Sequence, residues 1–502
     1  MVKVRIISWE KTAQTEVKTG TNLLDLIRSE QFDFYAPCGG AGTCGKCRVI
    51  IDGTGTVLAC LYTIEKDITV HLPDKRAMEV LTTQYEYSVN LPFNPGKSAS
   101  VASRPVGLAI DIGTTTIVYY LVDLITGIQL GVHSETNPQL GYGSDIISRI
   151  NYCMTNRDGL TELRELTIRS INRHLTLFSR KFSLSTDCFT VIVFAGNNTM
   201  LHILAGVDPV PIALAPFKPG FTEYKKFRGP EMGVKMNPQG EVRLLPSVSA
   251  YVGADIVAGI ASIGNDRMDK YLYVDIGTNG ELAIVTGKKI WCCATAAGPA
   301  FEGSNISCGS GAFEGAISRF HSSGFSTIAD AKPVSICGSG LFDIIAYLLD
   351  QGFLDENGAL EKPFLVSPAR NNAVDEDIVI TPQDVREVQL AKGAIAAGIS
   401  ILLKRSGISV DRLDKLVIAG GFGNYLSIDS AFRLGMFPEE LRGKTIQVGN
   451  AAGTGALLAV CSVKFMERIN DVIEKAEYIE LSYDEDFPME FAMKMSFPRS
   501  AN

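Results

Sequence analysis

The sequence predicts an α/β protein of several domains, and three observations support this. A chain of 502 residues is too long for one hydrophobic core. Four cysteines with intervals of five, two and twelve residues lie in and just after a glycine-rich run, at Cys38, Cys44, Cys47 and Cys60. A strand-turn-strand pattern with the turn sequence D-I-G-T occurs twice, at residues 106–124 and 271–285, which indicates an internal duplication.

Composition narrows the class of partner. The chain is 46% hydrophobic and 20% charged, with a net charge of -8, so it has no basic character to attract nucleic acid or an anionic membrane. We see no leader before the first expected strand, and the longest apolar stretches, such as 394–403, are too short to span a bilayer. We therefore expect a cytoplasmic protein without nucleic-acid or membrane partners, whose remaining cysteines are mostly reduced core residues.

The four cysteines predict a 2Fe-2S cluster. Three thiolates in one loop and a fourth further along can hold both irons, and Gly39, Gly40, Gly42 and Gly45 allow a tight loop around them. A tetrahedral zinc site is the alternative, but such sites usually consist of two separated C-x2-C pairs. The first interval, one residue longer than in plant-type ferredoxins, resembles the adrenodoxin branch.

The elements around these cysteines follow in order along the chain. Alternating residues 2–7 predict a strand, residues 22–27 have helical spacing, and residues 48–53 predict a strand and turn. Cys60 is expected to end another strand, and residues 68–72 form a last one. Taken with the cysteine spacing, residues 1–76 resemble a ferredoxin of the β-grasp fold.

Residues 77–104 are predicted to be a linker, because they are rich in Pro, Gly and Ser and lack periodicity. If fully flexible, this linker has a root-mean-square reach of about 30 Å and lets the cluster swing between partners. Alternatively, Tyr85, Tyr87 and Phe93 pack it along the surface as a rigid arm.

Each D-I-G-T hairpin is a candidate phosphate loop. The glycine allows close backbone approach, turn N–H groups and Thr or Asn side chains can cradle phosphate oxygens, and the aspartate can hold a hydrated Mg²⁺ or position water. One such turn alone is weak evidence, since aspartate in a turn also satisfies backbone N–H groups. The candidate residues are Asp111, Gly113, Thr114 and Thr115 in the first turn and Asp275, Gly277, Thr278 and Asn279 in the second.

A third element completes the pattern. The apolar strand at residues 416–419 opens into Gly420 and Gly421 at an expected helix start, where the backbone can pass close to an adenosine. Residues 448–456 begin a helix of small residues suited to close packing between crossing helices. This order resembles the ATPase superfamily of acetate and sugar kinases, Hsp70 and actin. The resemblance implies ATP binding and a duplicated ribonuclease-H-like fold, which we divide into a small middle domain, 105–186, and an actin-like ATPase domain, 187–502.

Nearly the whole chain resembles the ATP-dependent reductive activators of corrinoid proteins. The segments that carry this resemblance, besides the motifs above, are 137–139 with 141–150, 195–200, 246–255, 297–303, 337–341 and 384–393. It implies that the cluster passes one electron, taken from a low-potential donor, to the corrinoid protein of a methyltransferase system and converts inactive Co(II) to Co(I). It also implies a homodimer.

The implied reaction runs uphill. The reduction potentials of plant-type clusters lie near about −400 mV, and those of corrinoid Co(II)/Co(I) couples are generally lower. Each ~59 mV of difference makes the equilibrium constant for electron transfer to cobalt tenfold less favourable. ATP can offset this only by binding one state of the complex better than another.

Several residues have two interpretations. Glu281 either positions the attacking water or is an exposed strand residue; Asp255 is either a second carboxylate on the metal side or a charge favoured at a helix N-terminus. Arg386 and Lys392 either contact phosphate or a partner or belong to a solvated helix face. His202 is more often a core histidine than a corrinoid ligand, and adjacent Cys292 and Cys293 fit a buried strand better than a redox pair.

Three other functions stay open. Activators of 2-hydroxyacyl-CoA dehydratases also couple an actin-like ATPase to electron transfer, but through a 4Fe-4S cluster shared across a dimer. A sugar or acetate kinase has no need of a ferredoxin domain, and a non-enzymatic redox-sensing ATP switch would show no ATP turnover. Other corrinoid activators have a C-terminal 4Fe-4S domain, whereas residues 478–502 contain no cysteine. The best-known members resembling this chain are longer, so we expect it to have lost insertions.

Overall fold

The computed structural model of the protein describes the chain except for a few short segments. The residues outside the description are 9–10, 31, 33, 35, 37–38, 41, 43–46, 73–88, 265–267, 278, 304 and 500–502.

The N-terminal unit, residues 1–72, is built on a five-stranded sheet of order β2-β1-β7-β4-β5. Its strands are β1 (Val2–Ile7), β2 (Thr12–Val17), β4 (Arg48–Ile51), β5 (Gly55–Leu58) and β7 (Ile68–His71), with β3 (Thr21–Asn22) and β6 (Thr63–Ile64) pairing separately. Helix α1 (Leu23–Ser29) begins at Asn22, whose side chain accepts from the N–H of Leu24, and it buries its apolar residues against the sheet. The predicted β-grasp ferredoxin fold is confirmed.

The expectation that Cys60 ends a strand is wrong. β5 ends at Leu58, and Cys60 lies in the 3-10 turn η1 (Ala59–Leu61). The chain turns here because the N–H of Ala59 donates to the carbonyl of Cys47 at 2.8 Å, which draws the segment toward the other cysteine.

The described half of the linker is docked on the surface. The N–H of Val89 donates to Ser262 O, the N–H of Asn94 donates to Cys461 O, and Arg243 bonds the hydroxyl of Ser98 in the turn η2 (Gly96–Ser100). Residues 89–104 therefore follow the rigid-arm interpretation. Residues 77–88, with Tyr85 and Tyr87, lie outside the description.

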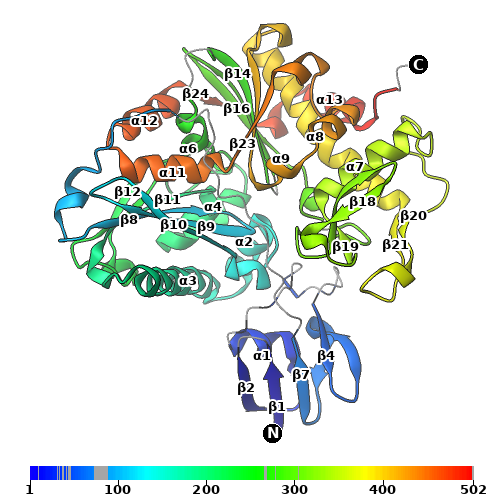
Figure 1. Cartoon of the computed structure of the whole chain (residues 1–502), viewed down its shortest axis with the longest axis horizontal. Helices are drawn as coiled ribbons and strands as arrows, with labels where there is room; N and C mark the ends of the chain where they lie inside the picture. Colours follow the sequence, from blue (N-terminus) through cyan, green and yellow to red (C-terminus); the bar gives the residue numbers. More distant parts are fainter. Residues whose placement is uncertain are drawn as a thin grey trace.

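The middle unit contains a six-stranded sheet of order β10-β9-β8-β11-β13-β12. Its strands are β8 (Val106–Ile112), β9 (Thr116–Asp123), β10 (Gln129–Thr136), β11 (Phe189–Gly196), β12 (Lys225–Arg228) and β13 (Glu241–Leu244). Helix α3 (Gly159–Phe182) covers one face, and α11 (Ala451–Cys461) covers the other (Figure 1). Because β11 pairs with β8, this sheet runs across residue 187, where we expected a domain boundary. We place the division between the two large units after α6 (Ala254–Ser262) instead.

The C-terminal unit repeats this design. Its sheet has the order β23-β22-β14-β15-β16-β24 and contains β14 (Lys270–Ile276), β15 (Gly280–Thr286), β16 (Ile290–Thr295), β22 (Lys415–Ala419), β23 (Thr445–Gly449) and β24 (Ala476–Tyr478). In both units an antiparallel meander of three strands is followed by a parallel strand beside its first member. The predicted duplicated fold is confirmed.

The remaining elements cover these sheets and extend the C-terminal unit (Figure 1). The helices are α2 (Ile146–Thr155), α4 (Asn198–Ala205), α5 (Val210–Ala213), α7 (Gly338–Asp350), α8 (Pro382–Ser406), α9 (Gly421–Tyr425), α10 (Ile428–Arg433), α12 (Phe465–Lys475) and α13 (Phe487–Met495). The small strands are β17 (Ala316–His321), β18 (Gly324–Thr327), β19 (Ser335–Ile336), β20 (Phe364–Ser367) and β21 (Ile378–Ile380). Among the described residues, no helix is both long enough and apolar enough to cross a lipid bilayer.

The two large units meet where α6 and α11 cross. A Cβ atom on Gly455 would lie 2.3 Å from the carbonyl oxygen of Ala258, so the two helix backbones touch. We expect Gly455→Ala to destabilise the protein by about 1–3 kcal/mol, the usual effect of overpacking. Urea unfolding measures this, with Gly443→Ala as the matched control because no atom lies within 4 Å of the Cβ position there. Equal effects of the two substitutions would contradict a tight crossing.

Candidate functional site

A cavity of about 450 Å³ lies between the middle and C-terminal units. Asp111 and Asp275 stand near the ends of β8 and β14, the central strands of the two sheets, and each is followed by its glycine turn. The cavity brings together ten of the eleven residues predicted for this site: Asp111, Gly113, Thr114, Thr115, Asp275, Gly277, Asn279, Glu281, Gly420 and Gly421. Thr278, the eleventh, lies outside the described residues.

The first D-I-G-T turn is held by hydrogen bonds from several elements. The N–H of Gly113 donates to Thr116 O at 3.0 Å, which closes the turn. Asn137 donates its side-chain amide to Gly113 O at 2.7 Å, and Asn197 donates to the hydroxyl of Thr114 at 3.0 Å. Thr115 donates to a carboxylate oxygen of Glu302 at 2.7 Å. The turn is therefore pre-shaped by groups far apart in sequence.

The glycine pair after β22 brings a third backbone segment to the cavity. Gly420 has φ of +90°, and a Cβ atom there would lie 2.5 Å from a carboxylate oxygen of Asp275. Only glycine permits this approach without moving the carboxylate. No atom lies within 4 Å of the Cβ position of Gly421, so this residue lines open space. The pair thus leaves room for a ligand beside Asp275.

Five carboxyl groups line the cavity: Asp111, Asp255, Asp275, Glu281 and Glu302. Burial, followed by the charge of Asp255, raises the pKa of Asp275 to about 7. Burial also raises the pKa of Asp111 to about 7, although the amide of Asn450 donates to this carboxylate at 2.8 Å and opposes the shift. The pKa of Asp255 is raised to about 6 and that of Glu281 is raised as well, again chiefly by burial.

This concentration of carboxylates fits a divalent cation. Each negative charge raises the pKa of its neighbours, and a cation in the cavity would relieve that repulsion. Among the described residues, no three His, Cys, Asp or Glu side chains form a ready-made metal cage. A hydrated Mg²⁺ needs only one or two carboxylates and the phosphates of its ligand.

The structure resolves some of the double interpretations. Glu281 on β15 lines the cavity instead of facing solvent, and Asp255, in the first turn of α6, lines it too. Lys392 is buried on α8, donates to Ser496 O and packs over the Phe497 ring, while Arg386 is exposed; neither lines the cavity. Cys292 and Cys293 are buried in β16.

His202 is a core residue, as its apolar surroundings suggested. Its ring stacks on Phe221, Nδ1 lies 2.8 Å from Asn198 O, and Nε2 accepts the N–H of Phe221 at 3.3 Å. Accepting that N–H requires a neutral ring. Burial lowers the pKa of His202 below its ordinary value of 6.5.

The stability of the protein should therefore fall as the pH drops below about 6.5, because His202 then binds a proton in the unfolded state but stays neutral in the folded state. We expect His202→Gln to reduce the loss of unfolding free energy between pH 7.5 and 5. The reduction should be about 1.4 kcal/mol for each unit by which the pKa is lowered. Urea titrations of both proteins at the two pH values measure it, and parallel losses would show that His202 does not contribute.

Sequence reasoning missed two contributors to the cavity. Asn450 caps α11 by accepting the N–H of Gly453 and also donates to Asp111. Asn197 caps α4 and also bonds Thr114. Asparagine before a run of helix-forming residues is a capping signal, so the caps were visible in the sequence, but their second contacts depend on tertiary structure.

Two of the four predicted cluster ligands are described, and they fit a shared metal ion. Cys47 and Cys60 are buried, with exposures of 1% and 8%, and their Sγ atoms are 3.2 Å apart. Two thiolates on one tetrahedral ion lie about 3.8 Å apart, so the two sulfur atoms would move slightly apart to share an ion. The side chain of Asn22 donates to Cys60 O at 2.9 Å and fixes the turn. Cys38 and Cys44 lie outside the described residues.

Comparison with known protein families matches three successive segments. Residues 7–67 match a 2Fe-2S iron-sulfur cluster binding domain, residues 106–268 match the RACo middle region, and residues 269–502 match the C-terminal domain of RACo, the ASKHA domain. The N-terminal unit is thus a 2Fe-2S domain, and the C-terminal unit has a nucleotide-binding fold. The family division at 268/269 falls after α6.

Relatives and a solved structure extend this match along the chain. The corrinoid activation enzyme RamQ of Eubacterium limosum is 33% identical over 421 residues, covering 78% of this chain and 71% of that protein. The [Co(II) methylated amine-specific corrinoid protein] reductase of Methanosarcina barkeri is 27% identical over 414 residues, covering 74% and 72%. A solved reductive activator for corrinoid, iron-sulfur protein superposes with a TM-score of 0.71 at 29% identity, covering 100% of this chain and 99% of that one. The chain belongs to the RACo family of corrinoid-activating proteins.

Proposed function

We propose that this protein uses ATP to reactivate a corrinoid methyltransferase protein by reducing its Co(II) to Co(I). The observation that carries the proposal is the combination of a 2Fe-2S unit with a carboxylate-lined cavity between two duplicated sheets, in a chain related to a corrinoid activation enzyme and to a corrinoid protein reductase. The cluster, when bound, supplies one electron to the cobalt of the partner and regains it from a low-potential donor.

The chain's own residues have separate tasks in this proposal. The four cysteines, Cys38, Cys44, Cys47 and Cys60, hold the cluster. The backbone and side chains of Gly113, Thr114, Thr115, Gly277, Thr278 and Asn279 cradle the phosphates, and the turn at Gly420 and Gly421 passes the adenosine. Asp111 and Asp275 hold hydrated Mg²⁺, and Glu281 positions the attacking water.

A conformational role for ATP follows from the energetics. Nucleotide chemistry can drive an uphill one-electron step only through a difference in binding between two states of the docked complex. The cavity has walls from both large units, so its ligand contacts both and can favour one relative arrangement. We further propose that the protein acts as a homodimer.

An anaerobic assay tests the function directly. Reconstituted protein, a low-potential reductant, a Co(II) corrinoid protein and Mg-ATP are mixed, and the visible spectrum is followed for Co(I). Co(I) should form only with ATP and not with the Cys44→Ser variant. If the cluster is reduced and ATP is consumed while several corrinoid partners stay Co(II), the function is that of an activator for another low-potential enzyme, such as a 2-hydroxyacyl-CoA dehydratase.

A further inference from the structure

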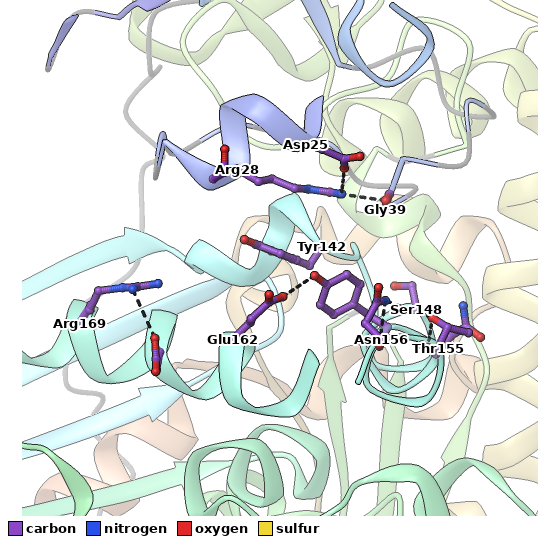
Figure 2. Close-up of a pocket in the computed structure, with 13 residues that line it drawn as sticks. Asp25, Arg28, Gly39, Tyr142, Ser148, Thr155, Asn156, Glu162 and Arg169 are labelled. Carbon is purple, nitrogen blue, oxygen red and sulfur yellow. Dashed lines mark hydrogen bonds and ion pairs between the residues drawn. The ribbon is translucent and has the colours of Figure 1, made fainter. Parts of the chain in front are cut away.

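A single arginine joins the N-terminal unit to the middle unit. Arg28 on α1 donates Nη2 to Gly39 O at 2.8 Å within its own unit, and it donates Nε to Gly141 O at 3.0 Å in the middle unit. Its Nη2 also bonds Gly141 O, and the guanidinium lies 4.9 Å from the centre of the Tyr142 ring. Figure 2 shows Arg28 between Gly39 and Tyr142. The side chain is only 14% exposed. One planar group therefore holds two backbone carbonyls of different units together.

The residue held on the N-terminal side belongs to the cluster loop, the segment 36–47. Gly39 directly follows Cys38, a predicted cluster ligand, in the sequence. It has φ of +65°, and a Cβ atom there would lie 3.1 Å from Tyr142 O. The backbone at Gly39 thus rests against the backbone of the middle unit, and Arg28 lies at that junction.

The residues held on the other side lead to the first phosphate loop, residues 113–115. Gly141 ends the turn η3 (Pro138–Gly141). Asn137, which precedes this turn, donates its side-chain amide to Gly113 O and its backbone N–H to Thr115 O. Fully buried Arg149 adds a second connection, because it donates to Gly143 O at 3.0 Å and also to Thr114 O. One short turn therefore separates the phosphate loop from the carbonyl that Arg28 binds.

We propose that Arg28 is a positioning residue that links the cluster loop to the phosphate loop, so that nucleotide binding and reduction of the cluster influence each other. The inference rests on the proposed function for the identity of the two ligands. The guanidinium suits this role because its rigid fork bonds both carbonyls at once, whereas a lysine ammonium on a flexible stem presents a single nitrogen. Because binding linkage is reciprocal, reduction of the cluster must change the nucleotide affinity by the same factor by which nucleotide binding changes the equilibrium constant for reduction.

The test measures linkage and does not depend on turnover. The midpoint potential of the cluster is determined by redox titration followed by electron paramagnetic resonance, with and without a saturating non-hydrolysable Mg-ATP analogue. A fivefold coupling, the lower end of the usual range, corresponds to a shift of about 41 mV. We expect at least that shift in the wild type, a smaller one in Arg28→Lys and none in Arg28→Met. The analogue's Kd should differ by the matching factor between oxidised and reduced wild type.

Arg5→Met is the matched control, because Arg5 is an exposed arginine on β1 of the same unit and its loss removes the same charge. It should keep the full shift. If the Arg28→Met variant does not bind the cluster, the size of the potential shift in Arg28→Lys tests the proposal instead. Equal shifts of the midpoint potential in the wild type and the Arg28 variants would overturn the proposal. The absence of a shift in analogue-saturated wild type would also overturn it, provided that the same preparation forms Co(I) with Mg-ATP. If the analogue does not bind at all, the proposed function falls together with this inference.

Discussion

Replacing Cys47 by serine should eliminate Co(I) formation. Cys47 is buried and its Sγ lies 3.2 Å from that of Cys60, so its loss removes one of two thiolates placed to share a metal ion. Losing an outer partner of a ligand typically weakens a metal site by about 10–100-fold, and losing the ligand itself should exceed that. The visible absorption of the cluster and the rate of Co(I) formation, both under anaerobic conditions, measure the effect.

The cavity of Cys47→Ser should stay intact, because it lies between the two large units. Nucleotide binding should therefore persist in the variant, with a Kd that no longer depends on whether reductant is present. Cys188→Ser is the control, since Cys188 is a half-buried cysteine of the middle unit outside both sites. A Cys47→Ser protein that still reduces cobalt at the wild-type rate would rule out the proposed electron route.

Asp275→Asn should lower ATP hydrolysis in the presence of the corrinoid partner by about 10²–10⁴-fold, the range for removing a group that acts on a proton or on the attacking water. Asparagine keeps the size of the side chain but loses the charge that Mg²⁺ or water would meet. Single-turnover release of phosphate measures the effect. Asp269→Asn is the matched control, because Asp269 is exposed next to the start of the same strand.

Thermal unfolding separates a chemical effect from a structural one. Burial and the charges of Asp255 and Asp111 disfavour the ionised form of Asp275 in the folded protein, so removing the charge should not lower the melting temperature in the absence of Mg²⁺. A large fall in melting temperature would assign a structural role to the carboxylate. Unchanged phosphate release would remove Asp275 from the proposed machinery.

Local patterns in the sequence predicted the fold and most of the cavity. Each D-I-G-T turn follows a buried strand, and in a duplicated fold the ends of equivalent strands face the same cleft, so Asp111 and Asp275 were predictable together. The roles of Asp255 and Glu281 stayed open because a helix N-terminus or a strand places no constraint on which cavity a carboxylate lines. The domain boundary that we expected at 186/187 falls within a sheet because the pairing of β11 with β8 is long-range.

The contacts of Arg28 illustrate what local patterns cannot supply. Its partner Gly141 is 113 residues away in the sequence, and the bond goes to a backbone carbonyl, which every residue possesses. No residue type marks such an acceptor. Asn450 likewise bonds a partner 339 residues away, although its acceptor is the side-chain carboxylate of Asp111.

The backbone contact between α6 and α11 is the point about which the two large units would rotate relative to each other. At Gly455 and Ala258 the backbones of the two helices touch, with no side chain between the closest atoms. Arg28 binds the N-terminal unit to the middle unit, on one side of that crossing. Any rotation between the two sheets would therefore move the N-terminal unit together with the middle unit. Because the N-terminal unit is farther from the crossing than the nucleotide cavity (Figure 1), a small closure around the nucleotide would displace the N-terminal unit by a larger distance relative to the C-terminal unit.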